Sequence, residues 1–377
     1  MNKRRLFPAV LVLLSIVIFT VSCTGSTLFA TKSWSEVNEI GENLVLTTKK
    51  GDVILVNPAS GKAVGQCETS EGRNGISAIY GTPLINEGFI YIGGFDGAVY
   101  KINPDSLVGS REDSPCTVLF DPNYQEESDP FIGGPSIKDD ILLINSESGL
   151  LYAIDINSGA ELWPTPFQAD SRTWNAPTIS GNTVYIGTLS GKIYSLDFNR
   201  SGFSINDDWN FKASAGIGSI TLDQDVMFIT SFNNKIYAIN RNNAEPIWQE
   251  PFEGENWFWA APVLFEDRLF APSLDHKFYI LDKNSGRSVA EPIETGGAIR
   301  GSAAITGNLI FFANEEGETW WIDATNLTYE AGGKLPKANY AGVSNLDGTL
   351  YIHTDEDLIF SVRADSRLPL QIFPFDD

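Results

Sequence analysis

The stretch NAPTISGNTVYIGTLSGKIYSLD, residues 175–197, decides the fold of this chain. It begins with small residues and a proline, continues into an apolar strand, turns at a glycine, and ends in a second strand that carries an aromatic residue. The same order of features recurs eight times along the 377 residues. Paired strands that repeat about every forty residues are typical of a β-propeller, in which each repeat forms one blade.

The repeat keeps its internal spacing from blade to blade. The residue before each first strand and a residue of the later strand both recur at intervals of 46, 52, 42, 43, 42, 41 and 40. Insertions therefore fall between repeats and not within them. The residues before the first strands, called marker residues below, are Trp34, Tyr80, Ile132, Trp174, Ile217, Trp259, Arg300 and Tyr340.

These intervals predict an all-β chain in which residues 34–377 form a single eight-bladed β-propeller of four-stranded antiparallel blades. The residue after each marker is small in every blade, as expected where eight first strands crowd around one axis. Trp163, Trp209 and Trp248 end apolar stretches that we assign to fourth strands, and we expect their indoles to wedge between blades.

A propeller has to join its last blade to its first, because an open sheet edge would pair with other chains. Two segments compete for the outer strand of the eighth blade. Residues 27–31 (TLFAT) precede Trp34 at the distance seen before other markers, and residues 370–373 follow the last repeat at the offset of a fourth strand. We favour the N-terminal segment as the ring-closing strand.

The N-terminus resembles a bacterial lipoprotein signal. Residues 1–22 contain a basic start and an apolar run, and small residues precede Cys23. We expect cleavage before Cys23, a lipid on its sulfur, and a short lipidated segment over residues 23–33. An ordinary signal peptide or an anchoring helix remains the alternative. The protein is then held in the cell envelope, at the outer membrane or, in a host with one membrane, on the outer face of the plasma membrane.

The net charge narrows the class of possible partners. The formal net charge of −22 excludes nucleic acid as a natural partner, because binding phosphates needs clustered Lys and Arg.

Cys67 and Cys116 belong to neighbouring blades, and an oxidising compartment allows a disulfide between them. Outer strands of neighbouring blades usually lie too far apart for a direct bridge, whereas the long insertions here can fold together. The disulfide and two free thiols both remain open.

The repeats at residues 133–163 and 175–197 resemble the pyrroloquinoline-quinone (PQQ)-like, or quinoprotein-like, repeat over essentially the whole mature chain. One family with this repeat comprises quinoprotein dehydrogenases, which bind PQQ and calcium in the propeller funnel. The other, the BamB family, comprises lipoproteins of the outer-membrane β-barrel assembly machinery, which are non-catalytic scaffolds. The second resemblance extends to length, lipoprotein signal and blade number. It implies a monomeric, membrane-anchored protein that holds a protein or extended peptide partner.

The enzyme interpretation lacks its usual chemical groups. The sequence has no vicinal Cys-Cys pair and no Cys-x-x-Cys-His motif, and its only histidines are His276 and His353, on different blades. Two histidines on different blades cannot together ligate one metal ion, and the sequence around neither of them indicates a Ser-His-Asp arrangement. We therefore expect no catalytic residues, no metal site and no cofactor, with PQQ and calcium disfavoured. A PQQ- or sugar-binding propeller remains the alternative.

One group of residues is a candidate site. Loops between blades and turns between second and third strands should share one side of the disc, where the marker residues surround the mouth of the funnel. Aromatic residues and Arg dominate protein interaction hot spots. We therefore predict partner binding at this funnel mouth, unless the rings only plug the channel. The candidate residues are Trp34, Tyr80, Trp174, Trp257, Trp259, Arg300, Tyr340, Arg73 and Arg172, with Phe258 and Asn339 nearby.

Overall fold

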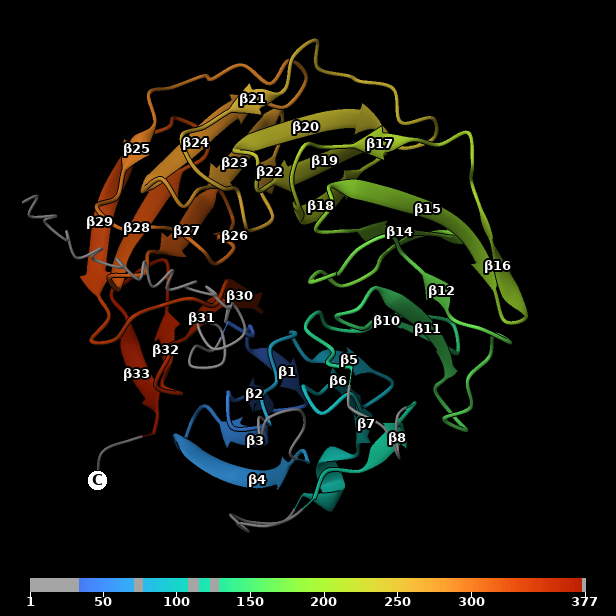
Figure 1. Ribbon diagram of the computed structural model, residues 1–377. Coiled ribbons are helices and arrows are strands. Elements are labelled where there is room, and N and C mark those ends of the chain that lie inside the picture. The colour runs from blue at the N-terminus through green and yellow to red at the C-terminus, as the bar shows by residue number, and fades with distance from the viewer. Residues whose placement is uncertain (1–33, 71–76, 108–114, 123–128, 375–377) are drawn as a thin grey trace, which may run out of the picture. The chain divides into compact units, whose positions relative to one another are not determined.

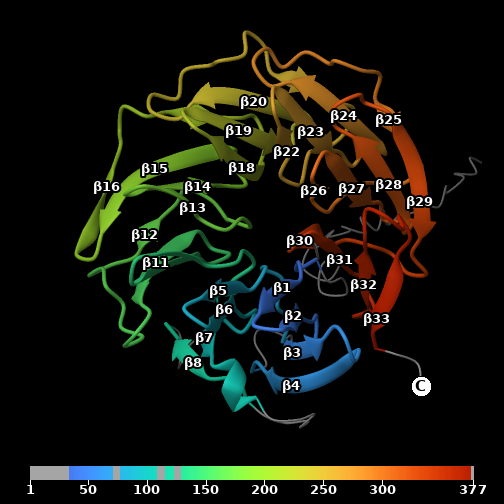
Figure 2. The same cartoon turned by 180° about the vertical axis from the view of Figure 1, so that it is seen from behind.

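The structure, a computed structural model, describes residues 34–70, 77–107, 115–122 and 129–374. Lys32–Asp377 form one compact unit. Within the described residues, eight antiparallel sheets are arranged around a central axis (Figures 1 and 2). The predicted all-β, eight-bladed propeller is confirmed.

Each blade runs from an inner first strand to an outer fourth strand in chain order. The strands of blades 1 to 4 are β1 (Asn38–Ile40), β2 (Asn43–Thr47), β3 (Asp52–Asn57) and β4 (Lys62–Glu68); β5 (Leu84–Asn86), β6 (Phe89–Gly93), β7 (Val99–Ile102) and β8 (Val118–Phe120); β9 (Ser136–Lys138), β10 (Ile141–Asn145), β11 (Leu150–Asp155) and β12 (Phe167–Gln168); β13 (Thr178–Ser180), β14 (Thr183–Gly187), β15 (Lys192–Asn199), β16 (Gly202–Ile205) and β17 (Phe211–Lys212). A 3-10 turn, η2 (Pro104–Ser106), follows β7.

The strands of blades 5 to 8 are β18 (Ile217–Asp223), β19 (Val226–Ser231), β20 (Lys235–Asn240) and β21 (Phe252–Glu253); β22 (Val263–Phe265), β23 (Arg268–Pro272), β24 (Lys277–Asp282) and β25 (Ile293–Glu294); β26 (Ala304–Thr306), β27 (Leu309–Ala313), β28 (Glu318–Asp323) and β29 (Tyr329–Lys334); β30 (Val343–Leu346), β31 (Thr349–His353), β32 (Ile359–Val362) and β33 (Leu370–Phe373).

Second strands are buried almost throughout, as in β10 and β14, because a neighbouring blade covers each face of the sheet. Their continuous apolar sequence follows from this position. The turn after each second strand contains one residue in the left-handed region in all eight blades. Glycine fills it in five blades, and Asn234, His276 and Asp357 fill it in the others. At Gly191 a Cβ would also lie 2.4 Å from the carbonyl oxygen of Ala213, which explains the glycine of that repeat.

The predicted wedging tryptophans are confirmed. The indole N–H of Trp163 donates to the carbonyl of Asn199 at 2.9 Å, and that of Trp248 donates to Lys283 at 2.9 Å, in each case on the next blade. Trp209 does the same toward Arg241 at 2.7 Å. The three tryptophans lie before the two-residue strands β12, β17 and β21 and not within them, so the apolar stretches that we assigned to fourth strands are only partly strand.

Our choice of ring-closing strand was wrong for the sheet of blade 8. β33 pairs with β32, so residues 370–373 form the outer strand, and residues 27–31 lie outside the described part. Blade 1 is joined to blade 8 by side chains. Ile359 and Ile372 pack with Val37 in one apolar cluster, and Ser344 donates to the carbonyl of Val37 at 2.5 Å. Within the described residues, apolar packing and a side-chain hydrogen bond join blades 8 and 1, and no strand is shared between their sheets.

Cys67 and Cys116 form a disulfide, with their Cα atoms 5.0 Å apart. The backbone beside them supports the approach, since the N–H of Cys116 donates to the carbonyl of Glu68 at 2.8 Å. Both cysteines are buried. The bridge therefore joins β4, the outer strand of blade 1, to the residues that precede β8, the outer strand of blade 2.

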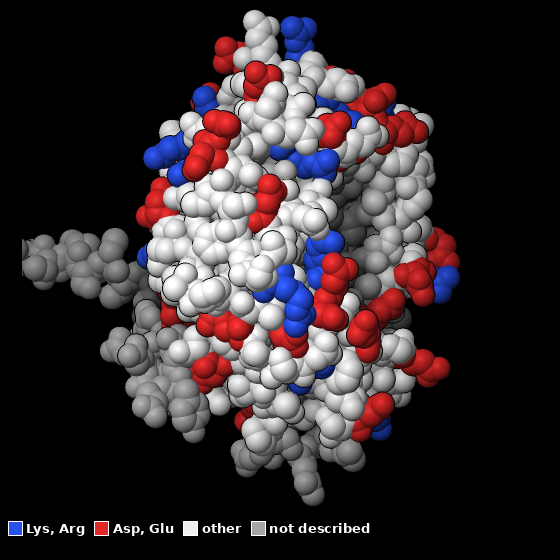
Figure 3. Space-filling view, turned by 90° about the vertical axis from the view of Figure 1, so that its right-hand side faces the viewer, with Lys and Arg blue, Asp and Glu red and all other residues white. Residues whose placement is uncertain are grey.

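Cys23 and the rest of the predicted signal lie outside the described residues. Among the residues that are described, no helix is long and apolar enough to span a membrane. On the side that includes blade 4, acidic and basic side chains are scattered among uncharged ones (Figure 3).

Candidate functional site

The funnel mouth is built by two sets of loops that bond to each other. In blades 2 to 8, where the loop before the first strand is described, the second residue of the turn after the second strand donates its N–H to that loop, as Phe232 does to Gly216 at 2.8 Å. Leu274 does the same to Trp257 at 3.0 Å. The inter-blade loops and these turns therefore share one side of the disc, as the repeat predicts.

Small residues beside the markers allow the first strands to approach the axis closely. A Cβ at Gly81 would lie 2.4 Å from the backbone nitrogen of Gly134, and one at Gly301 would lie 2.0 Å from the carbonyl of Ala341. Each contact joins neighbouring blades. Larger residues would force the blades apart and widen the channel.

Marker side chains meet across this narrow axis. Trp34 of blade 1 stacks on Tyr80 of blade 2, with ring centres 4.4 Å apart. Its ring centre also lies 6.3 Å from that of Trp259, which belongs to blade 6. Blades 1 and 6 are not neighbours in the ring, so this contact crosses the funnel. Trp174 of blade 4 joins the same cluster, 5.8 Å from Trp259.

Two arginines lie over the indoles of this cluster. The guanidinium of Arg300 is 5.1 Å from the ring of Trp259, and that of Arg172 is 5.5 Å from the ring of Trp174. Glu315 accepts from Arg300 Nε at 2.8 Å, and Glu147 pairs with Arg172 at 2.9 Å. Arg300 keeps 19% of its side chain exposed and Arg172 keeps 55%. The mouth thus combines indole faces with cations that still reach solvent.

The cluster is open to solvent at one side. Trp257 is 41% exposed and stacks on Phe232 with ring centres 4.9 Å apart, and Phe232 stacks in turn on Trp259 at 5.1 Å. Tyr80 is almost fully buried, and this burial raises its pKa to about 12. The inner part of the cluster is therefore a packed, neutral plug, and the part around Trp257 and Arg172 is the accessible surface.

The other predicted residues divide in the same way. Tyr340 is half-buried beside the mouth, whereas Phe258 and Asn339 are buried and belong to the core. Arg73 lies outside the described residues. The structure thus brings Trp34, Tyr80, Trp174, Trp257, Trp259, Arg300 and Arg172 into one cluster.

Sequence reasoning missed the turn residues that complete the mouth. Phe95, Glu147, Phe232 and Glu315 each stand second in the turn after a second strand, at one register position of the repeat. Phe95 packs edge-on against Tyr80 at 5.8 Å. The position recurs at the same intervals as the markers, so aligning the turns would have found it.

A carboxyl group lies among the small residues beside the axis. Glu36 takes the second position after the marker, which is small in the other blades, and its carboxylate accepts a hydrogen bond from Ser302. Burial raises the pKa of Glu36 above its ordinary value of 4.5. The protonated form is therefore favoured at this site compared with a carboxyl in water.

The histidines lie apart, as the sequence indicates. His276 is exposed in its turn, and His353 is buried in β31, where Nδ1 is 3.1 Å from the carbonyl oxygen of Ser35. His353 therefore contributes to the junction of blades 8 and 1. Among the described residues, no three His, Cys, Asp or Glu side chains gather in a way that could hold a metal ion.

Comparison with known proteins agrees with this geometry. The family described as outer membrane protein assembly factor BamB has a sequence model that matches residues 20–115, 118–204 and 204–326. The chain belongs to the BamB family. It is 24% identical over 159 residues to BamB of Shewanella oneidensis and 19% identical over 239 residues to BamB of Yersinia pestis. These matches cover 39% and 58% of this chain, but only 40% and 56% of the relatives.

Solved structures share the fold at low identity. BamB from Moraxella catarrhalis superposes with a TM-score of 0.66 at 15% identity, over 86% of this chain and 95% of that one. A tetrathionate hydrolase of Acidithiobacillus ferrooxidans also resembles the sequence, with 24% identity over 216 residues, which is 56% of this chain and 39% of that protein. The BamB-like propeller thus has relatives with different names, and the fold alone does not assign an activity.

Proposed function

We propose that this protein is a non-catalytic scaffold of the cell envelope, anchored by a lipid on Cys23, that binds a protein or extended peptide partner at its funnel mouth. Its role is BamB-like, in the assembly of outer-membrane β-barrel proteins. Membership of the BamB family supports this function. The monomeric ring acts as a rigid support whose loops hold the partner.

The exposed indole of Trp257, backed by Phe232 and Trp259, carries the proposal. A stacked set of rings cannot collapse inward, so its outer face stays available at little cost in side-chain entropy. Arg172 extends the surface with a solvated cation beside Trp174. Apolar ring faces with neighbouring arginines are typical of interaction hot spots.

The same cluster disfavours a cofactor in the funnel. Trp34, Tyr80 and Trp259 meet across the axis, so their rings occupy the space that a planar quinone would need. The residues present do not fit PQQ, and no step of the proposed function uses PQQ, calcium or another cofactor.

Removing the accessible part of the mouth tests the proposal. Trp257→Ala combined with Arg172→Ala should leave the melting temperature nearly unchanged and abolish co-purification of the β-barrel assembly machinery from detergent-solubilised membranes. Tyr329→Ala is the matched control, because Tyr329 is an aromatic residue 54% exposed on the outer strand β29. Equal co-purification by all variants would refute binding at the funnel mouth.

A second candidate is an enzyme, and the resemblance to tetrathionate hydrolase favours it. The protein would then turn over tetrathionate, or oxidise alcohols or sugars after addition of PQQ and calcium. We expect neither activity. Turnover that survives purification and is lost on substitution within the chain would overturn the scaffold proposal.

A further inference from the structure

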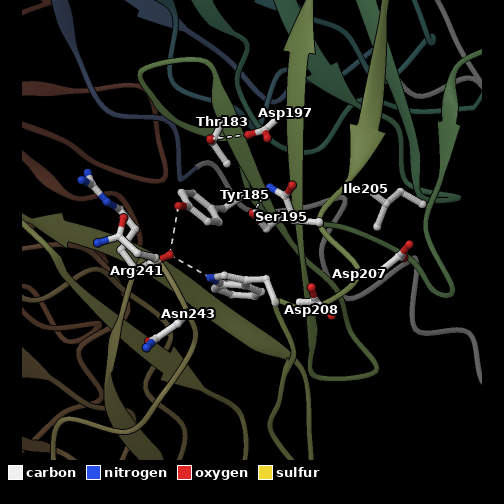
Figure 4. Close-up of a pocket in the computed structure, with 12 residues that line it drawn as sticks. Thr183, Tyr185, Ser195, Asp197, Ile205, Asp207, Asp208, Arg241 and Asn243 are labelled. Carbon is white, nitrogen blue, oxygen red and sulfur yellow. Dashed lines mark hydrogen bonds between the residues drawn. The ribbon is translucent and has the colours of Figure 1, made fainter.

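A groove of about 650 Å³ lies between blades 4 and 5 (Figure 4). Its residues come from the start of β14, from the outer part of blade 4 and from the turn after β20. These segments lie at the strand ends opposite to those that form the funnel mouth. The groove is therefore separate from the proposed partner site.

An irregular outer edge of blade 4 builds this groove. β16 pairs with the last residues of β15, β17 pairs with its first residues, and residues 206–210 lie between them. Trp209 fastens this segment, because its indole N–H donates to the carbonyl of Arg241 at 2.7 Å. Tyr185 donates to the same carbonyl at 3.3 Å. The groove thus has a fixed aromatic floor beneath a polar rim.

The rim has an excess of negative charge. Asp197, Asp207 and Asp208 are all exposed, and among the described residues no lysine or arginine pairs with any of them. Asp197 accepts from Thr183 at 2.7 Å, which leaves its charge uncompensated. Arg241 donates to Ser180 at 2.6 Å and pairs with Asp225 at 3.4 Å, so its charge is already matched by a carboxylate outside the groove lining.

The junction between blades 3 and 4 shows what an equivalent carboxylate binds. Asp155 of blade 3 and Asp197 of blade 4 have the same register, each opposite the first residue of the second strand of its blade. Asp155 pairs with Arg200 from the turn of the next blade, and this guanidinium holds the pKa of Asp155 well below its ordinary value. The corresponding turn of blade 5 brings Asn242 and Asn243 to the groove instead.

We propose that the groove binds the cationic side chain of an arginine or lysine on a partner protein. That side chain takes the place relative to Asp197 that Arg200 takes relative to Asp155. Asp207 and Asp208 add negative charge at the entrance, and the exposed aliphatic side chain of Ile205 can cover the stem of the incoming residue. The volume of the groove suits a side chain with its flanking backbone.

Nuclear magnetic resonance of the tryptophan indoles tests this site with the tripeptide acetyl-glycyl-arginyl-glycinamide. The Trp209 signal, assigned through Trp209→Phe, should shift on titration, and the citrulline analogue, neutral and nearly isosteric, should leave it in place. Asp197→Asn with Asp208→Asn should weaken binding about tenfold, since two attractive charges are lost. Glu250→Gln with Glu291→Gln removes two exposed carboxylates of blades 5 and 6 that do not line the groove, and should change the affinity by less than about twofold.

Three results would overturn the proposal. They are an unmoved Trp209 signal at saturating peptide, an equal response to the citrulline analogue, and equal weakening by the Glu250 and Glu291 pair. Asp208→Asn alone provides a second variant if the double substitution lowers the melting temperature. The funnel mouth takes no part in this titration, so failure here leaves the scaffold proposal standing.

Discussion

Arg300 lies with its guanidinium 5.1 Å from the ring of Trp259, and its Nε donates to Glu315 at 2.8 Å. One cation therefore serves two purposes at the funnel mouth. It covers an indole face, and it links a marker residue to the turn of the same blade. Its partial exposure explains why a charged residue can take a position that is aromatic or apolar in the other blades.

This pair predicts a measurable coupling. Arg300→Ala and Glu315→Ala should each lower the free energy of unfolding, and the double variant should lose less than the sum, with a coupling of about 0.5–1.5 kcal/mol. Urea denaturation of the four proteins gives this value. Additive losses would mean that the ion pair contributes nothing to the mouth.

The inter-blade indoles should contribute through their single hydrogen bond. Trp248→Phe keeps an aromatic ring but leaves the carbonyl of Lys283 without its donor, which should cost about 1–3 kcal/mol of unfolding free energy. Trp257→Phe is the control, because the Trp257 ring is exposed and belongs to the mouth. A comparable loss of unfolding free energy in both variants would mean that the smaller ring, and not the missing hydrogen bond, causes the loss.

Glu36 should make stability depend on pH. Its pKa is raised in the folded protein, so folding binds protons, and stability falls as pH rises from the ordinary value of 4.5 through the folded pKa. Glu36→Gln removes this loss. The advantage of Glu36→Gln over wild type in urea midpoint should therefore grow with pH across this range, and an advantage independent of pH would contradict the assignment.

The disulfide should stabilise the ring mainly by restricting the unfolded chain. The cysteines are 49 residues apart, and removing a bridge of this span by Cys67→Ser with Cys116→Ser should cost about 2–4 kcal/mol. Calorimetry of the oxidised wild type, the reduced wild type and the double variant provides the comparison. The reduced wild type and the double variant both lack the bridge, so their melting temperatures should be equal and lower than that of the oxidised wild type.

The sequence predicted the blades because a repeat constrains every copy at once. Eight marker residues recur at nearly regular intervals, so the chain has eight blades. The small residues beside Trp34 and Arg300 indicate which strands lie at the axis. The ring-closing strand was harder, since residues 27–31 and β33 both have the spacing of a fourth strand. Their relation to blade 8 depends on packing, which periodicity does not encode.

The site could be predicted only in part for a similar reason. The markers share a register and several share aromatic chemistry, so Trp174 and Trp259 stood out. The turn residues share a register but no chemistry, as Glu147 and Phe232 show. The disulfide remained open because it depends on the path of an insertion, and the groove at Asp197 arises from a local irregularity in one blade.

The most direct test of the scaffold account is photo-crosslinking in living cells. A benzoylphenylalanine placed at Trp257 should form a covalent adduct with a subunit of the β-barrel assembly machinery, identified by mass spectrometry. The same group at Tyr329, exposed on the outer strand of blade 7, should give no such adduct. Adducts from position 257 with no subunit of this machinery, or equal adducts from both positions, would contradict the account.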